Sequence, residues 1–309
     1  MKKQVVALVM AGAMALGMSV PVMADEEKTY KFGFTEWIAC EFFDSVYEGL
    51  DSVIRDEDTV IHTEGQADVT IQLGVVEDFI AQDVDLVFYN PVDSAASPVA
   101  VQALKDAGIK IVNFDSQVAD LNEVDAFVAT NNYAAGEVAG EQLIKDFPDG
   151  AKVAVLNYPA NTAAVDREEG FLAAIEKAEN IEIVATLDSE GLTETATSQM
   201  DDILQAHPDL DAVFAINDDG GMGAYAAINA AGMDTLIYSV NGSPEAKALV
   251  AEGGIFRCTS AQSTINMGKQ SAEVAYKILA GEDYEKEILI DPIAITSENI
   301  EEYGVDGWQ

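Results

Sequence analysis

Polar side chains stand at the ends of apolar, strand-like runs throughout this chain of 309 residues. Five such runs end on Asn90, Asp115, Asn157, Asn217 and Asn241. In an open parallel α/β sheet, ligands bind in the crevice outside the carboxyl ends of the strands. Amide and carboxylate groups at those ends can donate hydrogen bonds to a small polar molecule and accept them from it. The pattern therefore predicts a cleft that binds a small molecule.

The elements that would position these residues alternate between strands and helices along the whole chain, which predicts right-handed βαβ units and parallel sheets. We expect strands in the first half over residues 30–35, 59–63, 86–90, 109–115 and 126–130. In the second half we expect them over residues 152–157, 181–187, 212–217, 235–241, 255–261 and 287–290. Apolar residues at helical spacing predict helices near 43–54 and 71–80, and over 97–107, 134–147 and 264–279.

The first residues are typical of an export signal that is removed. Lys2 and Lys3 precede an apolar run of 14 residues, and small residues lead to an expected cleavage after Ala24. That run is shorter than the roughly 20 residues that a membrane-spanning helix needs. No cysteine near the cut could carry a lipid. We therefore expect residues 1–24 to be a signal peptide, and the product to lie in the periplasm or at the cell surface without spanning a membrane.

The remaining 285 of the 309 residues suffice for two domains, each with its own core. We predict an α/β fold of two similar lobes, each a parallel sheet flanked by helices, with a hinge of several strands between them. Residues 25–130 together with 263–291 are expected to form the N-terminal lobe. Residues 131–262 together with 292–309 are expected to form the C-terminal lobe.

The charge balance limits the classes of partner. The chain has 55 acidic and 16 basic residues, a formal net charge of −39, and loss of Lys2 and Lys3 would make it −41. Nucleic-acid binding rests on basic side chains that neutralise phosphates, so this acidity argues against it. The same field disfavours an anionic ligand. With 49% hydrophobic residues, the chain is expected to fold.

The residues that could hold a metal or form a disulfide are few. Cys40 and Cys258 lie far apart in the sequence, and we expect two buried free thiols rather than a bridge. His62 and His207 are too few and too scattered for a histidine-based metal site, and His207 is expected in a turn. No metal and no cofactor are predicted.

One glycine motif could suggest a dinucleotide. Residues 221–226 fit the spacing G-x-G-x-x-A, but Asp218 and Asp219 before it would repel a pyrophosphate. We expect these glycines to pack a helix instead. The chain contains no motif of a serine hydrolase, a zinc protease or a P-loop enzyme, so no catalytic activity is predicted.

Eight short motifs follow one another along the chain: Phe42-Phe43, Asn90-Pro91-x-Asp93-Ser94, Asn113-Phe114-Asp115, Arg167-x-x-Gly170-Phe171, Ala206-His207-Pro208-Asp209, Ala215-x-Asn217-Asp218, Asn241-Gly242-x-Pro244 and Ala261-Gln262. In this order and spacing, the chain resembles the periplasmic sugar-binding proteins of the ribose- and galactose-binding type, the type I periplasmic binding proteins that serve ABC importers. The likeness spans essentially the whole chain after residue 24. It implies two lobes that close on a ligand like a hinged clamp.

The resemblance implies ligand contacts from seven residues, namely Phe42, Phe43, Asp115, Arg167, Asn217, Asn241 and Gln262. The carboxylate would accept hydroxyl protons, and the guanidinium would donate several hydrogen bonds to ligand oxygens. The three amides would supply paired donors and acceptors. A phenylalanine would face the C–H side of a sugar ring.

Each of these residues also has a structural alternative. Adjacent helix residues point about 100° apart, so only one of the two phenylalanines needs to face the cleft. Asp115 could cap a helix or lie in solvent. Arg167 could pair on the surface with Glu168 or Glu169. Asn217 and Asn241 could stabilise strand-to-helix turns, and Gln262 could be an exposed hinge residue.

The chain departs from the pattern of the resembled family at four places. Ser116 stands where many relatives have arginine, and Asn241 stands where many have aspartate. Cys40 lies where asparagine is common, and Gly191-Leu192 replaces a frequent aromatic residue. One cation and one anion are thus lost together. As a hypothesis, the ligand has fewer hydroxyls than a typical hexose, or presents them differently.

Taken together, these features predict a monomeric receptor without catalytic activity. It would bind a small neutral sugar and deliver it to the permease of an ABC importer. A receptor for a furanosyl autoinducer or a nucleoside is an alternative. A sensory binding protein for a chemoreceptor or a kinase is another.

Overall fold

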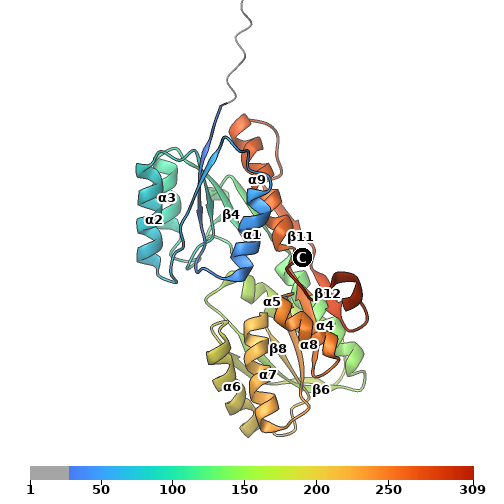
Figure 1. The fold of residues 1–309 in the computed structure, drawn as a ribbon. Helices are drawn as coiled ribbons and strands as arrows, with labels where there is room; N and C mark the ends of the chain where they lie inside the picture. The colour runs from blue at the N-terminus through green and yellow to red at the C-terminus, as the bar shows by residue number, and fades with distance from the viewer. Residues whose placement is uncertain (1–27) are drawn as a thin grey trace, which may run out of the picture.

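The computed structural model describes residues 28–309, and the predicted signal peptide lies outside the described residues. The chain forms two lobes that are joined end to end, each a six-stranded sheet with helices on both faces (Figure 1). This arrangement confirms the predicted fold class. None of the helices in residues 28–309 is long and apolar enough to cross a membrane.

The N-terminal lobe contains a sheet in which all neighbouring strands are parallel, in the order β11-β5-β4-β3-β1-β2. Its strands are β1 (Lys31–Thr35), β2 (Thr59–His62), β3 (Leu86–Tyr89), β4 (Lys110–Phe114), β5 (Ala126–Thr130) and β11 (Glu287–Ile290). Helices α1 (Glu41–Asp51) and α9 (Thr264–Ala280) pack on one face. Helices α2 (Val69–Ala81) and α3 (Pro98–Asp106) pack on the other, and a short 3-10 turn, η1, spans Leu121–Glu123.

The C-terminal lobe repeats this plan in the order β12-β10-β9-β8-β6-β7. Its strands are β6 (Ala151–Asn157), β7 (Ile181–Asp188), β8 (Ala212–Ala215), β9 (Leu236–Asn241), β10 (Phe256–Ala261) and β12 (Ile293–Thr296). Helices α4 (Asn132–Asp146) and α5 (Thr162–Ile175) cover one face. The other face carries α6 (Thr193–Ala206), α7 (Asp218–Ala231), α8 (Pro244–Glu252) and the short α10 (Ile300–Tyr303).

The inner strands of each sheet are apolar on both sides because both faces of the sheet are covered. In β3, Leu86 and Phe88 join the core under α1 and α9, whereas Val87 and Tyr89 join the core under α2 and α3. Successive side chains of a strand point to opposite faces, so one run of apolar residues supplies both cores. This explains why the strands could be located from composition.

The chain crosses between the lobes at three places: from β5 to α4, from β10 to α9, and from β11 to β12. The short strand β12 is antiparallel to β10 and was not predicted from the sequence. The C-terminal tail also reaches the N-terminal lobe. There the Trp308 ring lies edge-on to Phe42 at 5.6 Å, and the carbonyl of Gln309 accepts a hydrogen bond from the amide of Ile265.

The glycines of the run 221–226 lie within α7 and not in a loop. A Cβ on Gly223 would come within 2.5 Å of the carbonyl oxygen of Thr193 in α6. The close packing of α6 against α7 therefore requires glycine there. The structure agrees with the interpretation that this motif packs a helix.

Helices α4 and α5 approach each other just as closely, beside the junction of the lobes (Figure 1). A Cβ on Gly136 would lie 1.9 Å from the carbonyl oxygen of Arg167, and one on Gly170 would lie 1.9 Å from that of Tyr133. Neither backbone can yield without moving the helix. The position of Arg167 therefore depends on glycine at residue 136.

We predict that Gly136→Ala lowers the free energy of unfolding by about 1–3 kcal/mol, because the added methyl group forces the two helices apart. Gly74→Ala in α2 is the matched control, since a Cβ there meets nothing within 4 Å. It should raise the stability by roughly 0.5–1 kcal/mol, as expected for glycine replaced by alanine inside a helix. Equilibrium urea unfolding followed by circular dichroism measures both changes. Equal effects of the two substitutions would contradict the close-packing argument.

Candidate ligand-binding site

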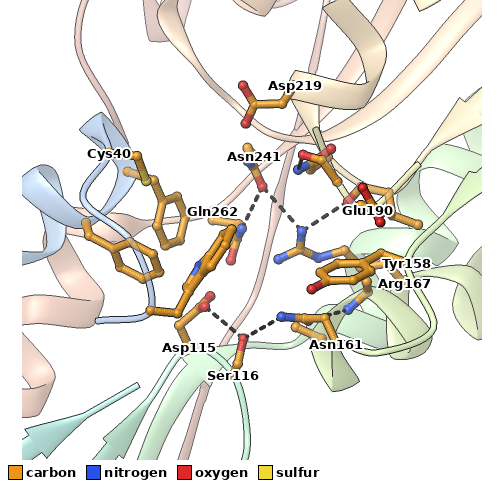
Figure 2. Close-up of a pocket in the computed structure, with 18 residues that line it drawn as sticks. Cys40, Asp115, Ser116, Tyr158, Asn161, Arg167, Glu190, Asp219, Asn241 and Gln262 are labelled. Atoms are coloured by element: carbon orange, nitrogen blue, oxygen red, sulfur yellow. Dashed lines mark hydrogen bonds between the residues drawn. The ribbon is translucent and has the colours of Figure 1, made fainter. Parts of the chain in front are cut away.

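A cavity lies between the two lobes, at the carboxyl ends of strands from both sheets (Figure 2). Its empty volume is about 590 Å³, part of which is open to solvent. All seven residues predicted to contact a ligand line this one cavity: Phe42, Phe43, Asp115, Arg167, Asn217, Asn241 and Gln262. The contacts themselves stay a prediction.

Arg167 projects from α5 and is buried, so it does not form the surface pair with Glu168 or Glu169 considered above. Its Nε donates to Oδ1 of Asn132 at 2.8 Å, and its Nη1 donates to the carbonyl of Ile216 at 3.0 Å. Burial lowers the pKa of the guanidinium, and the nearby carboxylate of Asp115 opposes that shift. Arginine stays protonated at such sites. Within residues 28–309, Nη2 has no hydrogen-bond partner and remains available to a ligand.

Asp115 follows β4 directly and is 7% exposed, so it is not the solvated acid considered above. Its Oδ2 accepts hydrogen bonds from Nδ2 of Asn90 at 3.2 Å and from Oγ of Ser116 at 3.1 Å. Burial raises the pKa of this carboxyl group, while the charge of Arg167 lowers it. Its other oxygen, Oδ1, accepts no hydrogen bond from the described part of the chain. That oxygen can accept from a ligand hydroxyl.

Asn241 and Gln262 form a pair at the ends of β9 and β10. Oδ1 of Asn241 accepts from Nε2 of Gln262 at 2.8 Å and from Nη1 of Arg167 at 3.3 Å. Gln262 is 1% exposed and is not the exposed hinge residue considered above. Its Oε1 is buried without a partner in residues 28–309. An unpaired buried acceptor costs roughly 1–3 kcal/mol, so a donor from a ligand would relieve it.

Asn217 has the capping role that was considered as its alternative. Its Oδ1 accepts from the amide of Gly220 at the start of α7, and its Nδ2 donates to the carbonyl of Gly191 at 2.8 Å. The oxygen and the nitrogen of this side-chain amide thus both stabilise the wall of the cavity. Asn90 is likewise a structural residue, because its side chain bonds to Trp37, Phe114 and Asp115.

Both phenylalanines at the start of α1 border the cavity, although one would suffice on helical geometry. Phe42 lies edge-on to Phe43 with ring centroids 5.1 Å apart, and Phe43 lies edge-on to Phe114 at 6.1 Å. Trp37 and Tyr158 add two more aromatic side chains to the wall. These rings provide apolar surface for the C–H groups of a ligand.

Buried Asp218 supports the C-terminal wall from behind. Its carboxylate accepts hydrogen bonds from Ser239 and Thr259 and from the amide of Ser243. Burial raises the pKa of this carboxyl to about 6, and these hydrogen bonds oppose the shift. The network fixes the turn that follows Asn241.

The structure brings to the cavity several residues that sequence reasoning missed. They are Trp37, Tyr158, Asn161, Ala163, Ala164, Glu190, Ile216 and Asp219, together with Cys40, Ser116 and Gly191, which were noted only as departures from the family pattern. Tyr158 directly follows Asn157, the predicted end of a strand. The expectation that ligand-binding residues lie at the carboxyl ends of strands could therefore have identified it. Asn157 itself bonds to Glu168 and does not line the cavity.

The prediction of two buried thiols is wrong for Cys40, although Cys258 is buried and both are free. Cys40 occupies the N-cap position of α1, in the loop that borders the cavity, and is exposed. The loop that leads from β1 into α1 places Cys40 at the cleft and not in the core of the lobe. Position along the chain therefore predicted its burial poorly.

Comparison with known proteins identifies the family. Residues 37–283 match the periplasmic binding protein domain. The ribose import binding protein of Bacillus subtilis is 32% identical over 249 residues, which is 80% of each chain. A putative rhizopine-binding protein of Rhizobium meliloti is 28% identical over 95% of this chain and 93% of that protein.

Solved structures agree with the family match. An ABC transporter solute-binding protein from Bacillus halodurans with bound myo-inositol has a TM-score of 0.83 and 26% identity, covering 89% of this chain and 96% of that one. A protein of the same kind from Actinobacillus succinogenes with bound D-allose has a TM-score of 0.82 and 25% identity, covering 89% and 100%. The match over residues 37–283 and the shared fold place the chain in the periplasmic binding protein family, whose members bind solutes and are not enzymes.

Proposed function

We propose that the protein binds a small neutral sugar, a monosaccharide, between its lobes and delivers it to the permease of an ABC importer. One observation carries the proposal: Asp115 and Arg167, from opposite lobes, border the same cavity. Within residues 28–309, Asp115 keeps an unpaired acceptor and Arg167 an unpaired donor. Relatives are named as import binding proteins for ribose and for apiose, which supports the class of ligand and of partner. The protein would act outside the cytoplasm.

The unpaired polar atoms suit a polyhydroxylated ligand. Asp115 and Gln262 offer acceptors, while Arg167 and Asn241 offer donors through Nη2 and Nδ2. A hydroxyl both donates and accepts, so one ring could satisfy groups of both kinds. The aromatic side chains that line the cavity would cover the apolar face of the ring. Only the closed lobes make both sets of contacts, so the ligand favours closure.

A thermal-shift panel tests the ligand class. The panel contains D-ribose, D-allose, D-glucose, D-galactose, myo-inositol and adenosine, each at millimolar concentration. A sugar present at 100 times its dissociation constant stabilises the folded state by about 2.7 kcal/mol, so the melting temperature should rise by a few degrees. A shift with adenosine alone would favour the nucleoside receptor. A clear preference for D-glucose or D-galactose would contradict the hypothesis of fewer or differently placed hydroxyls.

We predict that Asp115→Asn and Arg167→Gln each weaken binding of the best sugar of that panel roughly 10- to 150-fold. The reason is that a hydrogen bond to a charged group contributes about 1.5–3 kcal/mol. Isothermal titration calorimetry measures the loss. Asp146→Asn and Arg257→Gln are the matched controls, because they make the same charge changes in an ion pair away from the cavity. Unchanged affinity in both cavity variants would place the ligand elsewhere.

A further inference from the structure

The start of α5 touches the N-terminal lobe at two points. Nδ2 of Asn161 donates to Oγ of Ser116 at 3.1 Å, and Oγ1 of Thr162 lies 3.4 Å from Oγ of Ser94. The two serines belong to the loops after β4 and β3, and both are buried. Hydrogen bonds between side chains therefore cross from one lobe to the other beside the cavity.

Asn161 and Ser116, which contact each other, each form a further hydrogen bond within their own lobe (Figure 2). Oδ1 of Asn161 accepts from the amide of Ala164 at 3.0 Å and caps α5, which leaves its Nδ2 to cross the cleft. Oγ of Ser116 accepts that bond and donates its own proton to Oδ2 of Asp115 at 3.1 Å. A serine hydroxyl can do both at once. The carboxylate of Asp115 is thus linked to the first turn of α5 through a single serine.

The same two elements carry the proposed ligand contacts. Helix α5 holds both Asn161 at its start and Arg167 in its interior, and the loop after β4 holds Asp115 and Ser116 side by side. Both helix and sheet are rigid on the scale of a hinge motion. A closure that brings Arg167 opposite Asp115 therefore also brings Asn161 to Ser116.

We infer that Asn161 and Ser116 form an interlobe latch, which stabilises the closed lobes and orients the carboxylate of Asp115. Both are positioning residues that act through Asp115 and through closure. The apparent affinity of a receptor decreases when a smaller fraction of its molecules is in the binding-competent state. Loss of the latch lowers that fraction, and it also frees Asp115 to rotate.

Two substitutions cut the latch from opposite sides. Ser116→Ala removes the acceptor and leaves α5 unchanged. Asn161→Ser keeps a residue that caps helices well but has a side chain too short to reach across the cleft. Ser52→Ala is the matched control, because the hydroxyl of Ser52 donates to the carbonyl of Gly49 within the N-terminal lobe. Equal melting temperatures of the three variants would exclude a general loss of folding as the cause of any difference.

Small-angle X-ray scattering without ligand tests closure directly. We expect a larger radius of gyration for Ser116→Ala and Asn161→Ser than for the wild type and Ser52→Ala, since fewer molecules are closed. Equal radii in all four proteins would overturn the latch. This measurement does not depend on the identity of the ligand, so it can fail or succeed independently of the proposed function.

Calorimetry tests the coupling to the ligand, and this part rests on the proposed function. The probe is D-ribose, or D-allose or myo-inositol if one of them binds more tightly. Each single substitution should weaken binding about 2- to 12-fold, the range that a neutral hydrogen bond gives. The double variant should bind no more weakly than the worse single variant, because both changes cut the same bond between Asn161 and Ser116. Full additivity, or unchanged affinity in both single variants, would overturn the role of the latch in binding.

Discussion

The candidate site depends on the burial of one guanidinium. A buried charge is costly unless hydrogen bonds compensate it. Arg167 meets this requirement with acceptors from three elements: Asn132 on α4, the carbonyl of Ile216 after β8, and Asn241 at the end of β9. No carboxylate in the described residues forms a direct ion pair with it. The hydrogen bonds that compensate its charge therefore also fix the wall of the cavity, and one donor remains for a ligand.

Closure of the lobes is coupled to ligand binding because the same few elements carry the proposed ligand contacts and the contact between the lobes. The loop after β4 and the helix α5 hold Asp115 and Arg167, and the same two elements hold the contact between Asn161 and Ser116 that joins the lobes. Backbone strain lies at two residues of the cavity wall, since Asp115 has a φ of 57° and Asn241 has a φ of 139°. Such conformations cost of order 1–3 kcal/mol each and persist where the surroundings hold them. Here the hydrogen bonds of the two side chains do so.

The positions of the strands could be predicted from the sequence wherever apolar composition marks them. The eleven expected strands appear within two residues of their predicted ends. The inner strands are continuous apolar runs because they are covered on both faces. It missed β12, a four-residue strand that exists only through its antiparallel pairing with β10. It also named no helix at α5, although this helix carries both Asn161 and Arg167. Its view of Cys40 as buried was wrong, because that loop faces the cavity.

By itself, the sequence determined the class of fold and the polar character of the strand ends, since both follow from local composition and from the geometry of parallel sheets. Only the tertiary structure decided what each polar side chain does. Asn217 caps a helix, the side chain of Asn241 accepts a hydrogen bond from Arg167, and Asn161 donates a hydrogen bond to the other lobe. The residue type is the same in all three cases. A hydrogen bond forms only when the donor and the acceptor lie within a narrow range of distances. For Asn241 and Asn161, that distance is set by the packing of segments that lie far apart in the chain.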